Sequence, residues 1–252
     1  NITDGSSITY DETAPDASGV AVALSSGSDT GEKNDDNLTN LASPQFDISG
    51  LTTGDSVLVA ADDVFLYREV VGNGINSFSG IQLTSVLTHS ENIGHEIKVY
   101  LRDPAGNLST NTSTALTVRV DTELFTITST PDLLASDDSG FLNDDNFTNV
   151  SQPSFRLTNL PPNDRDGMKV YYWPLATDAA VPVGDGTVTT AEGDDANYRM
   201  ETAGEADIVQ LDDNLSAGWY AIKYTITDSA GNESAKSEQT LIYLDQTPAD
   251  AP

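Results

Sequence analysis

The chain has 252 residues, of which 40 are acidic and 11 are basic, and its formal net charge at pH 7 is −29. Nucleic acid is therefore excluded as a main partner, because neutralising phosphates requires clustered Lys and Arg. Cysteine is absent, which removes disulfides, thiolate metal ligands and thiol catalysis together. No stretch approaches the roughly 20 apolar residues of a membrane-spanning helix, so we expect no membrane insertion.

Short alternating apolar runs, separated by Gly, Pro, Asn, Asp and Ser, predict an all-β chain. The alternation is clear over 97–102, where Ile97 and Val99 face one way and Lys98 and Tyr100 the other. In the first half we expect strands at 20–25, 44–49, 55–60, 64–70, 81–87, 95–102 and 114–120. In the second half we expect them at 125–129, 153–158, 168–173, 180–183, 205–211, 218–227 and 239–244.

The sequence repeats itself. Residues 28–51 align without gaps on residues 137–160, with 11 of 24 positions identical. A second pairing sets 97–109 against 222–234, and both segments contain the pattern D-x-A-G-N. A third repeated feature is an aspartate directly after a predicted strand, and it occurs three times, at Asp11, Asp121 and Asp245.

These repeats divide the chain into two domains, 11–121 and 122–245. Seven strands in about 100–120 residues, without a helix, fit an immunoglobulin-like β-sandwich, so we expect two such domains in tandem. We interpret 1–10 as the last strand of a preceding repeat and 246–252 as a linker to the next, which makes the chain a segment of a longer array. The second domain has extra length near 176–204, which we expect to form a long hairpin or surface loop.

The acidic residues concentrate in turns, and several recur at matched places in both repeats. Mutual repulsion opens such clusters unless a cation binds. Calcium suits them best, because it takes six to eight oxygen ligands in flexible geometry. Zinc and copper prefer His or Cys, and the only histidines are His89 and His95. The alternative is a solvated acidic surface, as in proteins from saline habitats.

The assumed fold predicts which acids meet. In an immunoglobulin-like sandwich the loop after the first strand lies where the last strand leaves, and the loop before the last strand lies where the chain comes in. Between the two domains we therefore expect a calcium site formed by Asp29, Asp36, Asp121 and Asp228, with Asp35 and Asn232 as lesser candidates. Upstream, we expect a partial site formed by Asp11, Asp103 and Asn107. Downstream, we expect a partial site formed by Asp138, Asp144, Asp145 and Asp245.

Three motifs carry a family resemblance: the D-x-G…D-N-x-T-N loop, the D-x-A-G-N loop and the D-x-T-x-P linker. They resemble the immunoglobulin-like repeats of giant repeats-in-toxin adhesins and biofilm-associated surface proteins of bacteria. The resemblance implies Ca²⁺ between successive domains, export to the cell surface by a type I system, and an extender role that holds an adhesive tip off the cell. Asp121 departs from the linker motif, because Thr122 and Glu123 follow it in place of T-x-P.

No enzyme is expected. His89 and His95 lie in a polar stretch without a triad sequence, and acid pairs such as Asp62-Asp63 are typical of solvated turns. Trp173 and Trp219 are predicted to be core residues of the third and sixth strands rather than platforms for sugars.

Two functions stay open. The first is a monomeric calcium-binding extender whose partners are the neighbouring repeats of the same chain. The second is a binding module in which the region 176–204 contacts a glycan or a surface protein.

Overall fold

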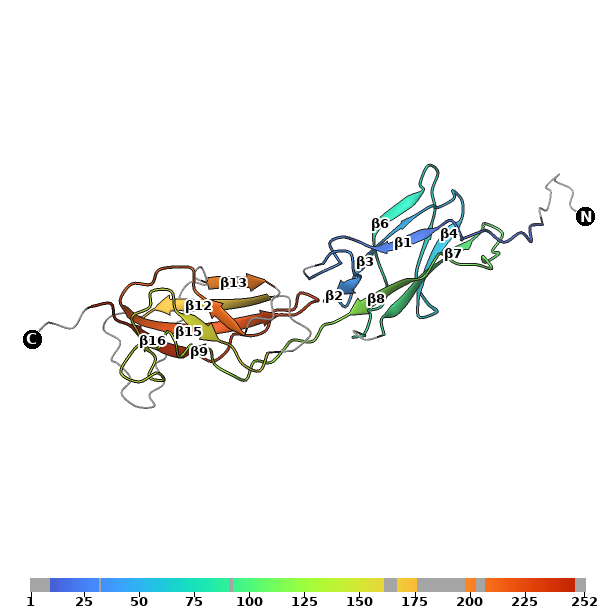
Figure 1. Cartoon of the computed structure of the whole chain (residues 1–252). Coiled ribbons are helices and arrows are strands. Elements are labelled where there is room, and N and C mark those ends of the chain that lie inside the picture. The colour runs from blue at the N-terminus through green and yellow to red at the C-terminus, as the bar shows by residue number, and fades with distance from the viewer. Residues whose placement is uncertain are drawn as a thin grey trace, which may run out of the picture. The chain divides into compact units, whose positions relative to one another are not determined.

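The computed structural model describes residues 10–31, 33–90, 93–160, 167–175, 198–202 and 207–247 (Figure 1). The chain divides into two units, Asn1–Glu123 and Leu124–Pro252. Every regular element in the described residues is a β-strand, which confirms the all-β prediction. The described part of the chain therefore holds no helix long and apolar enough to cross a membrane.

Unit 1 is a sandwich of two sheets. Its strands are β1 (Ala21–Leu24), β2 (Leu38–Thr39), β3 (Gln45–Ser49), β4 (Ser56–Ala61), β5 (Val64–Val70), β6 (Ser77–Gln82), β7 (His95–Arg102) and β8 (Leu116–Val120). One sheet has the order β1-β3-β6 and the other the order β2-β8-β7-β4-β5. All pairs are antiparallel except β2 with β8, which run parallel with Leu38 opposite Arg119.

Unit 2 has the same architecture. Its strands are β9 (Asp132–Leu133), β10 (Phe147–Thr148), β11 (Ser154–Arg156), β12 (Gly167–Pro174), β13 (Tyr198–Thr202), β14 (Ile208–Gln210), β15 (Gly218–Thr227) and β16 (Thr240–Leu244). The sheets have the orders β14-β11-β9 and β10-β16-β15-β12-β13, again with one parallel pair, β10 with β16. The two units thus share one strand order, which confirms two tandem immunoglobulin-like β-sandwiches.

Alternation along each strand places the core between the two sheets. On β7, Ile97, Val99 and Leu101 are buried, whereas the residues between them are at least partly exposed. Phe46 on β3 and Phe155 on β11 occupy equivalent positions of the repeat, and both side chains are completely buried. Each unit therefore has its own apolar core.

Some strand predictions were wrong. Residues 125–129 form no strand, and β9 lies further along the chain at Asp132–Leu133. Phe125 and Ile127 do pack against the core, but alternation reports only which way side chains face and not whether the backbone pairs with a neighbour.

The predicted strand 81–87 begins earlier, because β6 spans Ser77–Gln82. The two-residue strands β2 and β10 were missed, since two residues carry no period. The predicted strand 180–183, like most of the expected 176–204 loop, lies outside the described residues.

Trp173 is buried, as expected of a core residue, whereas Trp219 is only partly buried, contrary to expectation. Tyr172 and Tyr220 belong to that core, so the adjacent Trp173 and Trp219 point to the opposite face of the sheet. Trp173 is buried in a small separate cluster on that face, and Trp219 is partly exposed. The sequence did not reveal this because β12 and β15 carry large apolar residues on both faces.

Removing a core phenylalanine from either unit tests whether the units fold independently. Phe155→Ala should lower the free energy of unfolding of unit 2 by about 3–5 kcal/mol, the usual cost of emptying a buried phenylalanine site. Both tryptophans of the chain lie in unit 2, so urea denaturation followed by tryptophan fluorescence reports that unit alone. The matched variant Phe46→Ala in unit 1 should leave this transition in place. A comparable shift in both variants would mean that the units unfold as one.

Candidate cation sites

Two equivalent aspartates are buried in the loops that lead to β2 and β10. Asp29 is 8% exposed and Asp138 is 5% exposed. The backbone N–H of Asp29 donates to the Ser25 carbonyl at 3.2 Å, and that of Asp138 donates to the Leu134 carbonyl at 3.0 Å. These bonds turn the chain so that both carboxylates point inside their own loops.

Each of these carboxylates has only one satisfied oxygen. The N–H of Asn37 donates to Oδ2 of Asp29 at 3.4 Å, and the N–H of Asn146 donates to Oδ2 of Asp138 at 3.0 Å. In both residues Oδ1 is buried and has no hydrogen-bond partner. A buried, unpaired carboxylate oxygen is costly, so the same cost is present in both units.

The surroundings of these aspartates raise the pKa of both side chains. For Asp29 the main cause is burial, and the charges of Asp36 and Asp35 add to it against the opposing bond from Asn37. For Asp138 the main cause is again burial, with the same contribution from the matching acids Asp145 and Asp144. Each unit therefore places two further carboxylates close enough to act on one buried carboxylate. Such a site gains stability from a bound cation.

The neighbouring acids are fixed by their own turns. Oδ1 of Asp36 accepts the N–H of Leu38 at 3.0 Å, and Oδ1 of Asp145 accepts the N–H of Phe147 at 3.2 Å. The residues between, Asn37 and Asn146, have positive φ angles of 58° and 61°. Asn tolerates this left-handed conformation better than most residues, which accounts for the D-N pair in the motif.

Gly140 lies against the acidic loop of unit 2. A Cβ at this position would lie 2.6 Å from Oδ1 of Asp145 and 2.8 Å from Cβ of Phe147. Only glycine leaves room for the Asp145 carboxylate at that place. The glycine of the D-x-G motif thus belongs to the geometry of the site.

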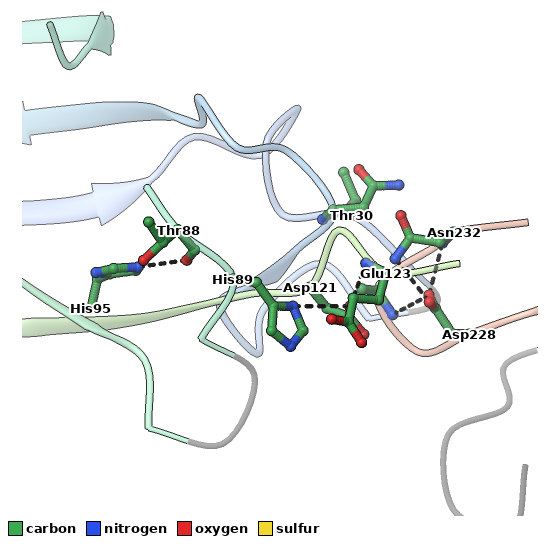
Figure 2. Close-up of polar contacts among 10 residues, drawn as sticks. Thr30, Thr88, His89, His95, Asp121, Glu123, Asp228 and Asn232 are labelled. Carbon is green, nitrogen blue, oxygen red and sulfur yellow. Dashed lines mark hydrogen bonds and ion pairs between the residues drawn. The ribbon is translucent and has the colours of Figure 1, made fainter. Parts of the chain in front are cut away.

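The D-x-A-G-N loops form closed hydrogen-bonded turns. In unit 1, Oδ1 of Asp103 accepts the N–H of Asn107 at 2.8 Å, and Oδ2 accepts its side-chain amide at 2.8 Å. These bonds to Asn107 are the main cause that lowers the pKa of Asp103. In unit 2, Asp228 and Asn232 make the same two bonds, both at 2.8 Å (Figure 2).

The turn in unit 1 also holds the chain that leads into the domain. The side-chain amide of Asn107 donates to the carbonyl of Asp11 at 2.9 Å. The structure thus brings together the three residues of the predicted upstream set, Asp11, Asp103 and Asn107. The contact between them is a hydrogen bond to a backbone oxygen.

The three strand-end aspartates share one local structure. Oδ1 of Asp11 accepts the N–H of Thr13, that of Asp121 the N–H of Glu123, and that of Asp245 the N–H of Thr247, at 2.9, 2.9 and 2.8 Å. Each is an Asx turn, in which the side chain hydrogen-bonds to the backbone two residues on. The predicted departure of the linker at Thr122-Glu123 from the D-x-T-x-P motif leaves this turn unchanged.

Sequence reasoning missed the contacts of both histidines. Nδ1 of His89 lies 3.4 Å from Oδ1 of the buried Asp121 (Figure 2). His95 is buried, and its Nδ1 lies 2.6 Å from Oδ2 of Asp62. Its Nε2 lies 2.7 Å from the Thr88 carbonyl (Figure 2). No sequence signal links these residues, because each contact joins positions brought together only by the fold.

Asp62 and Asp63 form the β4–β5 turn, with φ angles of 49° and 65°. Burial raises the pKa of Asp62, but hydrogen bonds from the N–H of Glu96 and the ring of His95 lower it by more. The pKa of Asp62 therefore lies below its ordinary value. The pair therefore fastens a hairpin to β7. It does not form the two facing carboxylates that a glycosidase site requires.

The structure brings only some of the acids of each predicted metal site close together. Asp29 is near Asp35 and Asp36, and Asp138 is near Asp144 and Asp145. Among the residues that the structure describes, no group of three or more His, Asp or Glu side chains is arranged to hold a metal ion. A calcium ion at Asp29 or Asp138 would therefore need carbonyl, amide or water oxygens as further ligands, which calcium readily accepts. The joint ligation by Asp29, Asp36, Asp121 and Asp228 stays a prediction.

The chain is similar to solved structures of other proteins at low sequence identity. It resembles the FN1–FN3 domains of chicken CNTN1 with 15% identity and a TM-score of 0.43, over 92% of this chain and 68% of that one. It resembles the fibronectin(III)-like modules of Clostridium thermocellum CbhA with 12% identity and a TM-score of 0.38, over 89% and 94% of the two chains. A tetra-tandem repeat in the extending region of a large adhesion protein shows 15% identity and a TM-score of 0.28, over 90% and 50%.

No curated protein matches the chain in sequence. The bacterial Ig-like domain family matches it twice, at residues 16–122 and 126–246. These two matches cover most of the chain, and each falls on one of the two sandwiches. The protein therefore belongs to the bacterial Ig-like domain family.

Proposed function

We propose that the chain is a calcium-binding extender segment of a large bacterial cell-surface adhesin. In this role tandem sandwiches provide length, and bound calcium limits bending at the linkers. The protein is exported by a type I system, acts as a monomer outside the cell, and performs no catalysis. The tandem bacterial Ig-like domains support a structural role at the cell surface.

One observation carries the calcium proposal: the buried, unpartnered Oδ1 atoms of Asp29 and Asp138. The same unfavourable group is present at the same position of both repeats, and each is flanked by two further acids. A cation at Oδ1 would remove the cost of burial and the repulsion together. The available ligand atoms are oxygens, and the chain contains no cysteine. Oxygen ligands favour calcium over zinc or copper.

The second step of the proposal concerns the linker. We propose that Asp121, held in its turn at the end of β8, takes part in a calcium site together with Asp29, Asp36 and Asp228. Without the ion, carboxylates about 4 Å apart repel one another by roughly 1 kcal/mol per pair in water. Bound calcium reverses this interaction and makes the linker stiff.

Calcium should raise the thermal stability of the protein. A ligand that binds only the folded state stabilises it by mass action, by about 2.7 kcal/mol when present at about 100 times its dissociation constant. Thermal unfolding followed by circular dichroism should therefore shift up by several degrees between chelator and millimolar calcium. Magnesium should act much more weakly, because it demands rigid octahedral geometry and keeps its water. Equal melting curves in chelator and calcium would favour the solvated acidic surface.

Neutralising the buried carboxylate should change stability in opposite directions with and without calcium. In chelator at pH 7, Asp138→Asn should be more stable than wild type by about 1 kcal/mol, because an ionised orphan oxygen is lost. Because folding raises the pKa of Asp138, its ionised form destabilises the folded state at pH values above the ordinary pKa of Asp. At low pH the group is protonated in both states, so the stability difference between variant and wild type should vanish. In calcium, the variant should gain less stability than wild type.

The matched control is Asp132→Asn, which removes the same charge from an exposed position on β9. It should keep the full calcium gain and show no stabilisation in chelator. If Asp138→Asn keeps the full calcium gain as well, Asp138 is not a ligand.

Asp121→Ala tests the stiffening separately. Each sandwich should remain folded, but the pair should become flexible even in millimolar calcium, because one bridging ligand is lost. Small-angle scattering measures this as a broader distribution of maximum dimension than in wild type. The control Asp245→Ala removes the equivalent Asx turn at the end of unit 2 and should leave the distribution narrow. An Asp121→Ala protein as narrowly distributed as wild type would contradict the bridging role.

A further inference from the structure

Three aromatic rings meet on the outer face of the five-stranded sheet of unit 2. Trp219 on β15 lies opposite Tyr243 on β16, and Phe147 on β10 lies opposite Tyr243 from the other side. The ring centroids of Trp219 and Tyr243 are 5.1 Å apart, and those of Phe147 lie 5.6 Å from Tyr243 and 5.7 Å from Trp219. We call these residues the three-ring cluster.

The cluster is accessible and is separate from the core. Phe147 is 40% exposed, and Trp219 and Tyr243 are half-buried. Their neighbours along the strands, Tyr220 and Leu244, belong to the core on the other face. An exposed group of large aromatic side chains is typical of a binding surface rather than of a stabilising core.

Unit 1 shows that the fold does not require these rings. Aligning the repeats places Leu38 at the position of Phe147 and Gly94 at that of Trp219. The matching parallel pairs, β2 with β8 and β10 with β16, place Arg119 at the position of Tyr243. The same sandwich therefore forms without any of the three rings, so the cluster is a property of unit 2 alone.

A second aromatic pair on the same face holds a cation of the protein itself. Tyr171 and Trp173 are stacked, with centroids 5.8 Å apart and planes 6° from parallel. Nζ of Lys236 lies 4.8 Å from the Tyr171 ring and 5.2 Å from the Trp173 ring. A cation in this position is attracted by the negative face of the ring. Among the side chains that the structure describes, no Lys or Arg covers the three-ring cluster in this way.

Charge near the cluster favours a cation. Asp144 and Asp145 precede Phe147 with only Asn146 between, and the N–H of Phe147 donates to Oδ1 of Asp145 at 3.2 Å. The chain as a whole carries a net charge of −29. Carboxylates beside aromatic rings repel an anionic ligand and attract a cationic one.

We propose that the three-ring cluster binds an arginine side chain of a basic partner protein. The guanidinium group is planar and weakly hydrated, so it stacks on aromatic faces while its N–H groups reach nearby carboxylates. The rings supply the stacking surface, and Asp144 and Asp145 supply the negative charge. Asp144 and Asp145 also act on Asp138, so calcium bound there would reduce the negative charge beside the rings, and the peptide is tested in chelator.

The test uses the full chain and a short peptide of alternating Arg and Gly as the probe. Binding is followed by the NMR signals of the two indole N–H groups, in about 0.3 M salt, where long-range attraction to the acidic surface is largely screened. The peptide should shift the Trp219 signal saturably and leave that of Trp173 in place. A neutral cello-oligosaccharide serves as the second probe and should shift neither.

Two variants replace a ring of the cluster with the residue found at the equivalent position of unit 1. Phe147→Leu removes one ring, and Tyr243→Arg places a cation of the protein itself in the cluster. Each should weaken peptide binding by about fivefold or more, in line with the strength of partly desolvated cation–π contacts. The control Phe65→Leu removes an exposed ring of unit 1 that packs edge-on against Tyr100, and it should bind like wild type.

Three results would overturn the proposal. One is the absence of a saturable Trp219 shift in wild type. Another is equal binding by wild type and by both folded cluster variants, with folding confirmed by their melting curves. The third is a Trp219 shift caused by the oligosaccharide and not by the peptide, which would make the cluster a sugar platform.

Discussion

Both units are organised around a carboxylate that is withdrawn from water while one of its oxygens lacks a hydrogen bond. The left-handed Asn37 and Asn146 each donate a backbone N–H to Oδ2 of the buried aspartate. The two acids that follow in each loop raise the cost of ionising it further by charge repulsion. A fold shaped only for stability would place an amide or an apolar residue there. A carboxylate at that position in both repeats is what the proposed cation binding would require.

The two units show how one scaffold carries different surfaces. They share strand order, parallel pairs, Asx turns and closed D-x-A-G-N loops, and these features set the ends of each sandwich. They differ on the outer face of the larger sheet, where unit 1 has Leu38 and Arg119 and unit 2 has Phe147 and Tyr243. The turns and loops at the ends of the sandwiches are alike in both repeats, as expected if both ends join to neighbouring domains in the same way. The faces are free to vary, because the core does not depend on them.

The sequence predicted most where side-chain pattern and backbone pairing coincide. The strands β5, β7 and β15 were predicted with their observed bounds, because each is a long run without a turn residue. The segment 125–129 failed because its alternation packs side chains without pairing the backbone. Short β2 and β10 carry too few residues to show any period.

For the candidate site, the internal repeat alone identifies Asp29 and Asp138 as equivalent. It could not show that one oxygen of each is buried and unpaired, since that depends on how the loop folds back on Asn37 and Asn146. The contact of His89 with Asp121 and that of His95 with Asp62 were also invisible, because they join residues far apart in the sequence. The partial exposure of Trp219 was not anticipated, because apolar residues occupy both sides of its strand.

The parallel pairing of β2 with β8, and of β10 with β16, has a mechanical consequence. When a sandwich is pulled by its two ends, β2 is drawn toward its start and β8 toward its finish. Since the two strands run parallel, these forces are opposite along a shared line, so the hydrogen bonds between them are loaded in shear and resist together. The loop that holds the buried aspartate lies between the first strand and this pair, so tension reaches it before it reaches the pair. The hydrogen bonds of this loop are therefore loaded before those of the parallel pair.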